Sequence, residues 1–151
     1  MADIRHRVGV NAPVAEVYDA VATREGTERW WTRDVEGEAQ VGGELAFRFG
    51  RPDPSAVMQL VELTSPSRVV WRCVRGPNEW LDTTVTFDLR AEGDETVVVF
   101  THAGWREPVE FMHHCSTKWG IYLLSLKHGL EGAKATPWPD TEKISSWDGT
   151  R

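Results

Sequence analysis

The chain has 151 residues, of which 40% are hydrophobic, and a formal net charge of −6 at pH 7. These values indicate one globular domain rather than a disordered chain. The acidic balance and the scattered basic residues argue against a nucleic-acid surface, which needs clustered Lys and Arg. Eight tryptophans in so small a domain suit either a core or the walls of a cavity.

The N-terminal sequence, the apolar runs and the cysteines indicate in which cellular compartment the protein is expected. The N-terminal sequence lacks an apolar signal core, and no apolar run approaches the roughly 18 residues of a membrane span. Cys73 and Cys115 lie far apart without CxxC spacing, so we expect free thiols in a reducing compartment. A cytoplasmic protein without membrane contact is therefore expected.

A strand and two helices are expected first along the chain. Residues 4–10 alternate apolar and polar side chains, which predicts a strand. Residues 11–23 carry apolar side chains at helical spacing, with Asn11 as the expected helix cap. A shorter helix is expected over residues 24–31.

A run of antiparallel strands follows. Apolar alternation predicts strands over 42–50, 56–64 and 68–76. Gly42-Gly43 supplies the turn at the start of the first, and a Pro-Ser turn separates the second from the third. Residues 81–104 then form the clearest hairpin, with "AEGDE" as its turn. Including the first strand, six or seven strands are expected.

The pattern changes to a long helix over residues 107–130. Large side chains recur there every three or four residues, which predicts one buried stripe. The stripe consists of Phe111, Cys115, Trp119, Tyr122, Leu126 and Leu130. Residues 133–151 contain two prolines and no period, so they are expected to be a tail that wraps the surface through Trp138 and Trp147.

The stretch "FMHHC" in this helix suggests a metal site at first sight. Successive helical residues turn by about 100°, so His113, His114 and Cys115 point in three directions and cannot converge on one ion. We expect Cys115 on the buried stripe, His113 in solvent and His114 at the flank. No metal site is expected here.

Strands grouped in this way, with the helices segregated, predict an α+β fold in which the long helix lies across a curved sheet. Several quoted segments then resemble a known family: residues 28–50, 57–73 and 82–105, followed by the long helix. From about Ile4 to Gly132 they are similar to the START-like (SRPBCC, helix-grip) superfamily. The branch they resemble most is related to the activator of the heat-shock-protein-90 ATPase. The most telling pieces are Trp30-Trp31, Gly42-Gly43 and "TVVVFTHAG".

The resemblance implies a START-like domain over residues 1–132 and a tail over 133–151. It also implies a curved antiparallel sheet wrapped around the C-terminal helix, with a hydrophobic cavity between them. Members of this superfamily bind lipids, hormones, polyketides or other apolar molecules, and some are enzymes. The leading hypothesis is therefore the binding of an apolar, aromatic small molecule. Its expected contacts are Trp30, Phe47, Phe87, His102, Met112, Cys115 and Trp119.

Three residues in that set have competing interpretations. His102 lies on the inward face of its strand, where it either contacts the ligand, acts as an acid–base group, or is a buried histidine satisfied by the backbone. Cys115 is either a nucleophile or, as we favour, a buried structural cysteine. Of the adjacent Trp30 and Trp31, one is expected to face the pocket and the other the surface.

Two alternative functions remain open. One is an enzyme of the polyketide cyclase or aromatase type that uses His102. The other is a chaperone-interacting protein, which is less favoured because a lone domain has no second domain to clamp a partner. A homodimer also stays open. Because the sequence contains no Ser–His–Asp ordering, phosphate loop, GxGxxG or HExxH motif, no cofactor is expected.

Overall fold

The computed structural model describes residues 1–148. The strands are β1 (Ala2–Val10), β2 (Asp34–Gly37), β3 (Glu44–Arg48), β4 (Ala56–Thr64), β5 (Arg68–Arg75), β6 (Thr84–Glu92) and β7 (Glu95–Trp105). The helices are α1 (Val14–Ala22), α2 (Arg24–Glu28), a 3-10 turn η1 (Asn78–Trp80) and α3 (Glu110–Leu130). Within these residues, no helix combines the length and apolarity that a membrane crossing requires.

The strands form one seven-stranded sheet in the order β1-β7-β6-β5-β4-β3-β2, and all neighbours are antiparallel. Its curvature has identifiable causes. The β4–β5 register shifts twice, leaving Val61 on β4 and Val74 on β5 as extra residues. Each such bulge bends its strand and increases the local twist. The α+β prediction with a curved antiparallel sheet is therefore confirmed.

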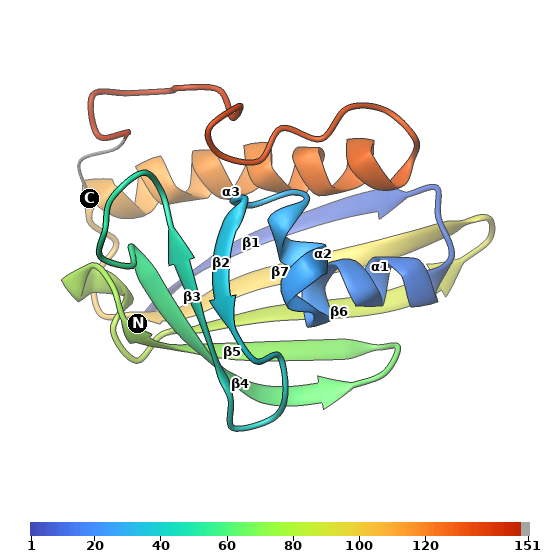
Figure 1. Cartoon of the computed structure of the whole chain (residues 1–151), viewed down its shortest axis with the longest axis horizontal. Coiled ribbons are helices and arrows are strands. Elements are labelled where there is room, and N and C mark those ends of the chain that lie inside the picture. Colours follow the sequence, from blue (N-terminus) through green and yellow to red (C-terminus); the bar gives the residue numbers. More distant parts are fainter. Residues whose placement is uncertain (149–151) are drawn as a thin grey trace.

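Helix α3 lies along the sheet, and the C-terminal segment runs back along α3 (Figure 1). The predicted stripe is confirmed and is wider than expected, because Met112, Leu123 and Ser125 are buried beside it. Leu130, at the helix end, is half-buried. The helix thus buries a broad face against the sheet and the tail.

The end of α3 sets the direction of the tail. The N–H of Ala133 donates to the carbonyl of His128 at 2.8 Å, and the N–H of Gly132 donates to that of Gly129 at 3.4 Å. This pair of bonds is the Schellman motif, which needs a left-handed residue directly after the cap. Gly132 meets that need with φ +84°. The reversal sends the chain back along α3 instead of away from the domain.

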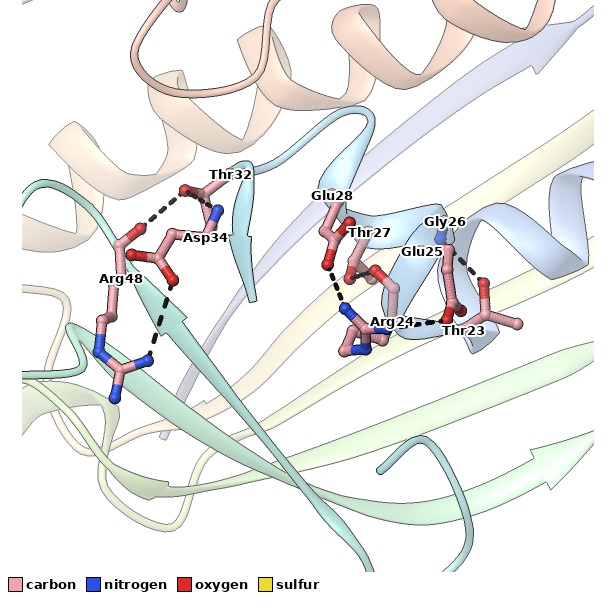
Figure 2. Close-up of polar contacts among 9 residues, drawn as sticks. All are labelled: Thr23, Arg24, Glu25, Gly26, Thr27, Glu28, Thr32, Asp34 and Arg48. Carbon is pink, nitrogen blue, oxygen red and sulfur yellow. Dashed lines mark hydrogen bonds and ion pairs between the residues drawn. The ribbon is translucent and has the colours of Figure 1, made fainter. Parts of the chain in front are cut away.

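The first two helices are joined without a linker. Oγ1 of Thr23 accepts from the N–H of Gly26 at 2.9 Å and donates to the carbonyl of Asp19 at 2.7 Å, so it caps α2 while closing α1. Figure 2 shows this cap beside the ion pair between Arg24 and Glu28. The expectation that Asn11 caps α1 was wrong. Pro13 occupies that position, because its fixed φ suits a helix start without a side-chain bond.

Strand β2 was not identified from the sequence. It is four residues long with one buried residue, Val35, so it shows too little alternation to be recognised. Polar contacts hold it to β3: Oγ1 of Thr32 donates to the carbonyl of Arg48 at 2.7 Å and accepts from the N–H of Asp34 (Figure 2). The strand forms one edge of the sheet.

Candidate functional site

The space between the middle of the sheet and α3 is filled by aromatic side chains. Trp31 stacks on Trp71 at a centroid distance of 5.7 Å and contacts Phe47 at 4.3 Å. Phe87 packs edge-on against Trp71 at 5.0 Å, and Phe100 lies 4.7 Å from Trp119. The bulk of these rings explains why the expected central cavity is occupied by the protein itself.

Trp30 and Trp31 are both buried, so the expectation that one faces the surface was wrong. Their exposed fractions are 1% and 3%. The residues follow the end of α2 rather than lying within it, and their rings stack at 6.1 Å. Nε1–H of Trp30 donates to the carbonyl of Ala20 at 2.8 Å, which satisfies the buried indole.

A pocket of about 340 Å³ opens beside this packed centre, toward the N-terminal half of α3. One wall is α3, and another is formed by the β3–β4 connection with the segment around η1. The third wall is the C-terminal segment. The lining residues are Trp31, Phe49, Arg51, Ser55, Ala56, Pro77, Trp80, Phe111, His114, Cys115, Lys118, Trp119, Tyr122, Trp138, Pro139, Thr141, Lys143, Trp147 and Asp148.

Two indoles of the lining are nearly parallel. The rings of Trp80 and Trp119 have centroids 5.9 Å apart and planes 17° from parallel. Trp31 lies against Trp119 at 5.0 Å and joins them to the aromatic core. A flat ligand can extend such an arrangement through stacking contacts.

A hydrogen-bonded chain behind this wall involves His102. Nε1–H of Trp119 can only donate, so Nδ1 of His102 accepts, at 3.1 Å. Nε2 of His102 therefore carries the proton and donates to Oγ1 of Thr83 at 2.8 Å. That hydroxyl donates to the carbonyl of Trp80 at 2.6 Å. The chain connects both parallel tryptophans to one buried imidazole.

Burial and these hydrogen bonds determine the protonation and the accessibility of the His102 imidazole. Its side chain is fully buried, and burial lowers its pKa to about 3. Both ring nitrogens have protein partners, and these partners are side chains rather than the backbone. Because a general acid or base must reach the proton that it transfers, this imidazole is poorly placed for catalysis. Its Nδ1 is instead the acceptor for the buried indole N–H of Trp119.

The seven residues expected to contact ligand divide into two groups. Cys115 and Trp119 line the pocket. The other five lie outside its lining, buried behind it or beside it: Trp30, Phe47, Phe87, His102 and Met112. Strand alternation and helical spacing identify buried faces, but they do not separate the residues that border a pocket from those packed behind them.

The three side chains of the "HHC" triplet differ in burial, as expected. His113 is exposed, Cys115 is buried, and His114 lies partly buried at the flank. Nδ1 of His114 is 2.8 Å from Oγ of Ser145 in the tail, and Phe111 stacks on its ring at 6.0 Å. Two members of the triplet, His114 and Cys115, therefore face the pocket.

The C-terminal segment is held by a series of polar contacts along α3. The N–H of Thr136 donates to Oγ of the buried Ser125 at 2.8 Å. Further on, the N–H of Trp138 donates to the carbonyl of Trp31 at 2.8 Å, and Asp140 pairs with Arg33. These contacts explain how a segment with no helix or strand forms a pocket wall. Residues 149–151 of the predicted tail lie outside the described residues.

The far end of the segment is fixed around Asp148. Its carboxylate accepts from the N–H groups of Ile144 and Ser145, and it lies 3.3 Å from Nζ of Lys118. Burial acts to raise its pKa, but these hydrogen bonds and Lys118 lower it overall. Nζ of Lys118 also donates to the carbonyl of Glu142 at 2.9 Å. Lys118 thereby holds the tail to α3.

The sequence did not reveal most of the lining. The tail contributes six of the nineteen lining residues that the structure describes, and Trp138 and Trp147 were the signal for its packing. Phe49 lies just past the end of β3, inside the strand predicted over 42–50, whereas Arg51 and Ser55 belong to the β3–β4 loop and Trp80 lies in a 3-10 turn. Loops often carry binding residues, yet their side-chain directions do not follow from spacing.

Comparison with known proteins adds the family context. A family model described as Activator of Hsp90 ATPase homolog 1-like protein matches residues 11–131. Among curated proteins, no significant match was found. The family match covers α1 through α3 and stops before the C-terminal segment.

Solved structures share the fold. The solution structure of the Aha1 dimer from Colwellia psychrerythraea is 37% identical, with a TM-score of 0.79, and the match covers 87% of this chain and 97% of that one. The crystal structure of CalU16 from Micromonospora echinospora is 25% identical, with a TM-score of 0.73 and coverages of 91% and 77%. A protein from Staphylococcus saprophyticus is 18% identical, with a TM-score of 0.72 and coverages of 88% and 95%, which shows the fold alone.

Proposed function

The chain belongs to the family of Activator of Hsp90 ATPase homolog 1-like proteins, and we propose that it binds an aromatic small molecule in the pocket along α3. The observation that carries the proposal is the near-parallel pair Trp80 and Trp119, both of which line the pocket. Indole rings at a pocket wall favour flat ligands, since they offer a large apolar face at little entropic cost.

The size of the pocket supports a ligand of moderate dimensions. Its volume of about 340 Å³ lies at the small end of the range of about 300–1,000 Å³ that is typical of small-molecule sites. A bicyclic or small tricyclic compound suits this space better than a long acyl chain. We propose that Cys115 and Trp119 contact the ligand directly, while Trp30, Phe47, Phe87, His102 and Met112 support the wall from behind.

Binding is favoured over catalysis because of the position of His102. An enzyme of the cyclase type requires a titratable group exposed to the substrate. In this chain both ring nitrogens of His102 bond to Trp119 and Thr83, and the ring is fully buried. The residue therefore supports a binding wall instead of reacting.

A homodimer forms a second part of the proposal. The Colwellia protein, 37% identical over 87% of this chain, was solved as a dimer. Strands β1 and β2 are the two edges of the sheet, and each has a side with no neighbouring strand in the described residues. Sedimentation velocity measures the assembly: a species of twice 17.1 kDa supports the dimer, and a monomer at all concentrations contradicts it.

The binding proposal is tested by thermal unfolding with a neutral aromatic probe, naphthalene-2-carboxamide. Bound ligand stabilises the folded state by RT ln(1 + [L]/Kd), about 2.7 kcal/mol at a hundredfold excess over Kd. Trp80→Ala removes one stacking face and should weaken binding about tenfold, because stacking on an aromatic residue contributes about 1–3 kcal/mol. Leu81→Ala, at the neighbouring residue outside the lining, is the matched control.

Two results would contradict the proposal. One is the absence of any stabilisation by flat aromatic probes of this size. The other is an equal affinity of Trp80→Ala and Leu81→Ala, which would place binding elsewhere.

A further inference from the structure

We infer that the ligand of this pocket is an aromatic anion, such as an aryl carboxylate, and that Lys143 of the C-terminal segment selects it. The inference rests on the proposed function and narrows it to one class of compound. It rests on two features that the aromatic walls do not explain: the charge of the lining, and an exposed lysine of the lining, Lys143, whose ammonium group has no partner among the described residues.

The charge of the lining is opposite to that of the protein. The whole chain carries a formal charge of −6. The described lining residues nevertheless include three cationic groups, Arg51, Lys118 and Lys143, against one carboxylate, Asp148. A cationic pocket in an acidic protein attracts anions locally while the rest of the surface repels them.

The one carboxylate of the lining is already engaged. Asp148 receives two backbone N–H groups and the ammonium of Lys118. Lys118 is engaged as well, by Asp148, by the carbonyl of Glu142, and by the ring of Tyr122 at 5.3 Å from its centroid. These two charges therefore largely compensate each other, and neither needs a ligand.

Lys143 differs from Lys118. It lines the pocket, its side chain is exposed, and no described residue forms a hydrogen bond or ion pair with its ammonium group. A flexible ammonium at the rim can reach a carboxylate on a ligand without first losing a protein partner. Such rim charges act mainly on selectivity and on the association rate.

Trp80 supplies the face on which the ring of the anion would stack. Its indole lines the pocket and lies nearly parallel to that of Trp119. Its Nε1–H has no acceptor among residues 1–148, but this group is buried beneath the surface, as are the unpartnered Nε1–H groups of Trp71 and Trp105, so it makes no contact with the ligand. Stacking on Trp80 and attraction to Lys143 therefore come from different sides of the pocket.

Lys143 lies outside the part of the chain that the family model covers. The family match ends at residue 131, whereas Lys143 lies twelve residues further on. Membership of the family therefore does not by itself supply this residue.

The test compares two probes of equal shape on the full chain. Naphthalene-2-carboxylate carries the charge, and naphthalene-2-carboxamide is its neutral counterpart. We expect the carboxylate to bind about tenfold more tightly, which is the order of one charge-assisted hydrogen bond. Raising the salt from about 0.01 M to about 1 M, which shortens the screening length about tenfold, should weaken the carboxylate alone.

Lys143→Met tests the residue, because methionine retains the apolar stem without the charge. This variant should remove most of the preference for the carboxylate while leaving carboxamide binding unchanged. Lys134→Met, at an exposed tail lysine outside the lining, is the matched control and should retain the preference.

Three outcomes would overturn the inference. Equal binding of the two probes would leave an aromatic pocket without selectivity for anions, so the proposed function would stand and this inference would fall. A preference that persists in Lys143→Met would remove the assigned role of Lys143. Binding of neither probe would contradict the inference and the proposed function together.

Discussion

Nε1–H of Trp119 donates a 3.1 Å hydrogen bond to Nδ1 of His102, so the histidine that the sequence singles out is a structural support for a pocket wall. The bond fixes the tautomer, since an indole cannot accept. It also fixes the plane of Trp119 against Trp80. The two parallel rings therefore depend on a residue that never reaches the pocket itself.

Replacing His102 should destabilise the fold through the partners left behind. His102→Leu leaves the Trp119 N–H without an acceptor, which costs about 1–3 kcal/mol. It also removes one of the two hydrogen bonds of the Thr83 hydroxyl, which still donates to the carbonyl of Trp80. His102→Asn retains an acceptor near the Nδ1 position and should lose less. Urea unfolding measures both. His113→Leu, at an exposed position, should change the free energy of unfolding little, and an equal loss in all three variants would contradict this role.

The low pKa of His102 also predicts a pH dependence of stability. Burial lowers the pKa to about 3 in the folded state, against about 6.5 in an unfolded chain. Between these values the unfolded state binds a proton that the folded state does not, so stability falls as pH decreases. The contribution is complete above about pH 6.5 and decreases by about 1.4 kcal/mol per pH unit below it.

The pH prediction is checked by unfolding wild type and His102→Asn at several pH values. Subtracting one series from the other removes the shared titration of Asp and Glu. The difference should have the stated slope between about pH 6 and pH 4. A flat difference would show that the imidazole is accessible to protons in the folded protein.

The tail depends on a glycine in the β3–β4 connection. A Cβ at Gly50 would lie 2.7 Å from Cζ2 of Trp138, and the residue has φ +84°. Gly42 has nearly the same φ, +86°, but open space around its Cβ position. Gly42→Ala therefore measures the backbone strain alone, about 1–2 kcal/mol. Gly50→Ala adds displacement of Trp138.

We expect Gly50→Ala to release the C-terminal segment. Limited trypsin digestion, followed by mass measurement, should show faster cleavage after Lys134 and Lys143 than in Gly42→Ala. The variant should also bind naphthalene-2-carboxylate more weakly. Equal cleavage rates in the two variants would mean that the segment does not need the Trp138 contact.

The thiols of Cys73 and Cys115, neither of which is in a disulfide, should differ in reactivity. Cys73 is fully buried, and burial raises its pKa to about 11, so little thiolate forms near neutral pH. Cys115 borders the pocket. We expect iodoacetamide to label Cys115 first and naphthalene-2-carboxylate to slow that reaction, as read by peptide mass spectrometry. Cys115→Ser is the control, and labelling of Cys73 at the same rate would contradict the burial argument.

Much of the fold was predictable because its hydrophobic residues recur with a clear strand or helix periodicity. Strand alternation in 56–64 and 68–76 matches β4 and β5, and the stripe of α3 continues over most of its length. The hairpin of β6 and β7 follows from its turn. Short elements were missed, since β2 offers four residues and a cap such as that of α1 depends on local geometry.

The candidate site was less predictable for a physical reason. Periodicity reports which face of an element is buried, and it identified Cys115 and Trp119 correctly as inward. It carries no information on how completely large side chains fill the interior. Here Trp31, Trp71 and Phe47 occupy the expected cavity. The pocket forms instead where the C-terminal segment, which has no hydrophobic periodicity, packs along α3.

Native mass spectrometry of freshly purified protein tests the central claim most directly, with the same sample measured after denaturation. The account predicts a small-molecule mass that is retained by the folded chain, lost on denaturation and replaced by added naphthalene-2-carboxylate. It also predicts that Trp80→Ala retains much less of either compound than Leu81→Ala. A folded wild-type chain that shows no bound mass, even with excess naphthalene-2-carboxylate, would contradict it.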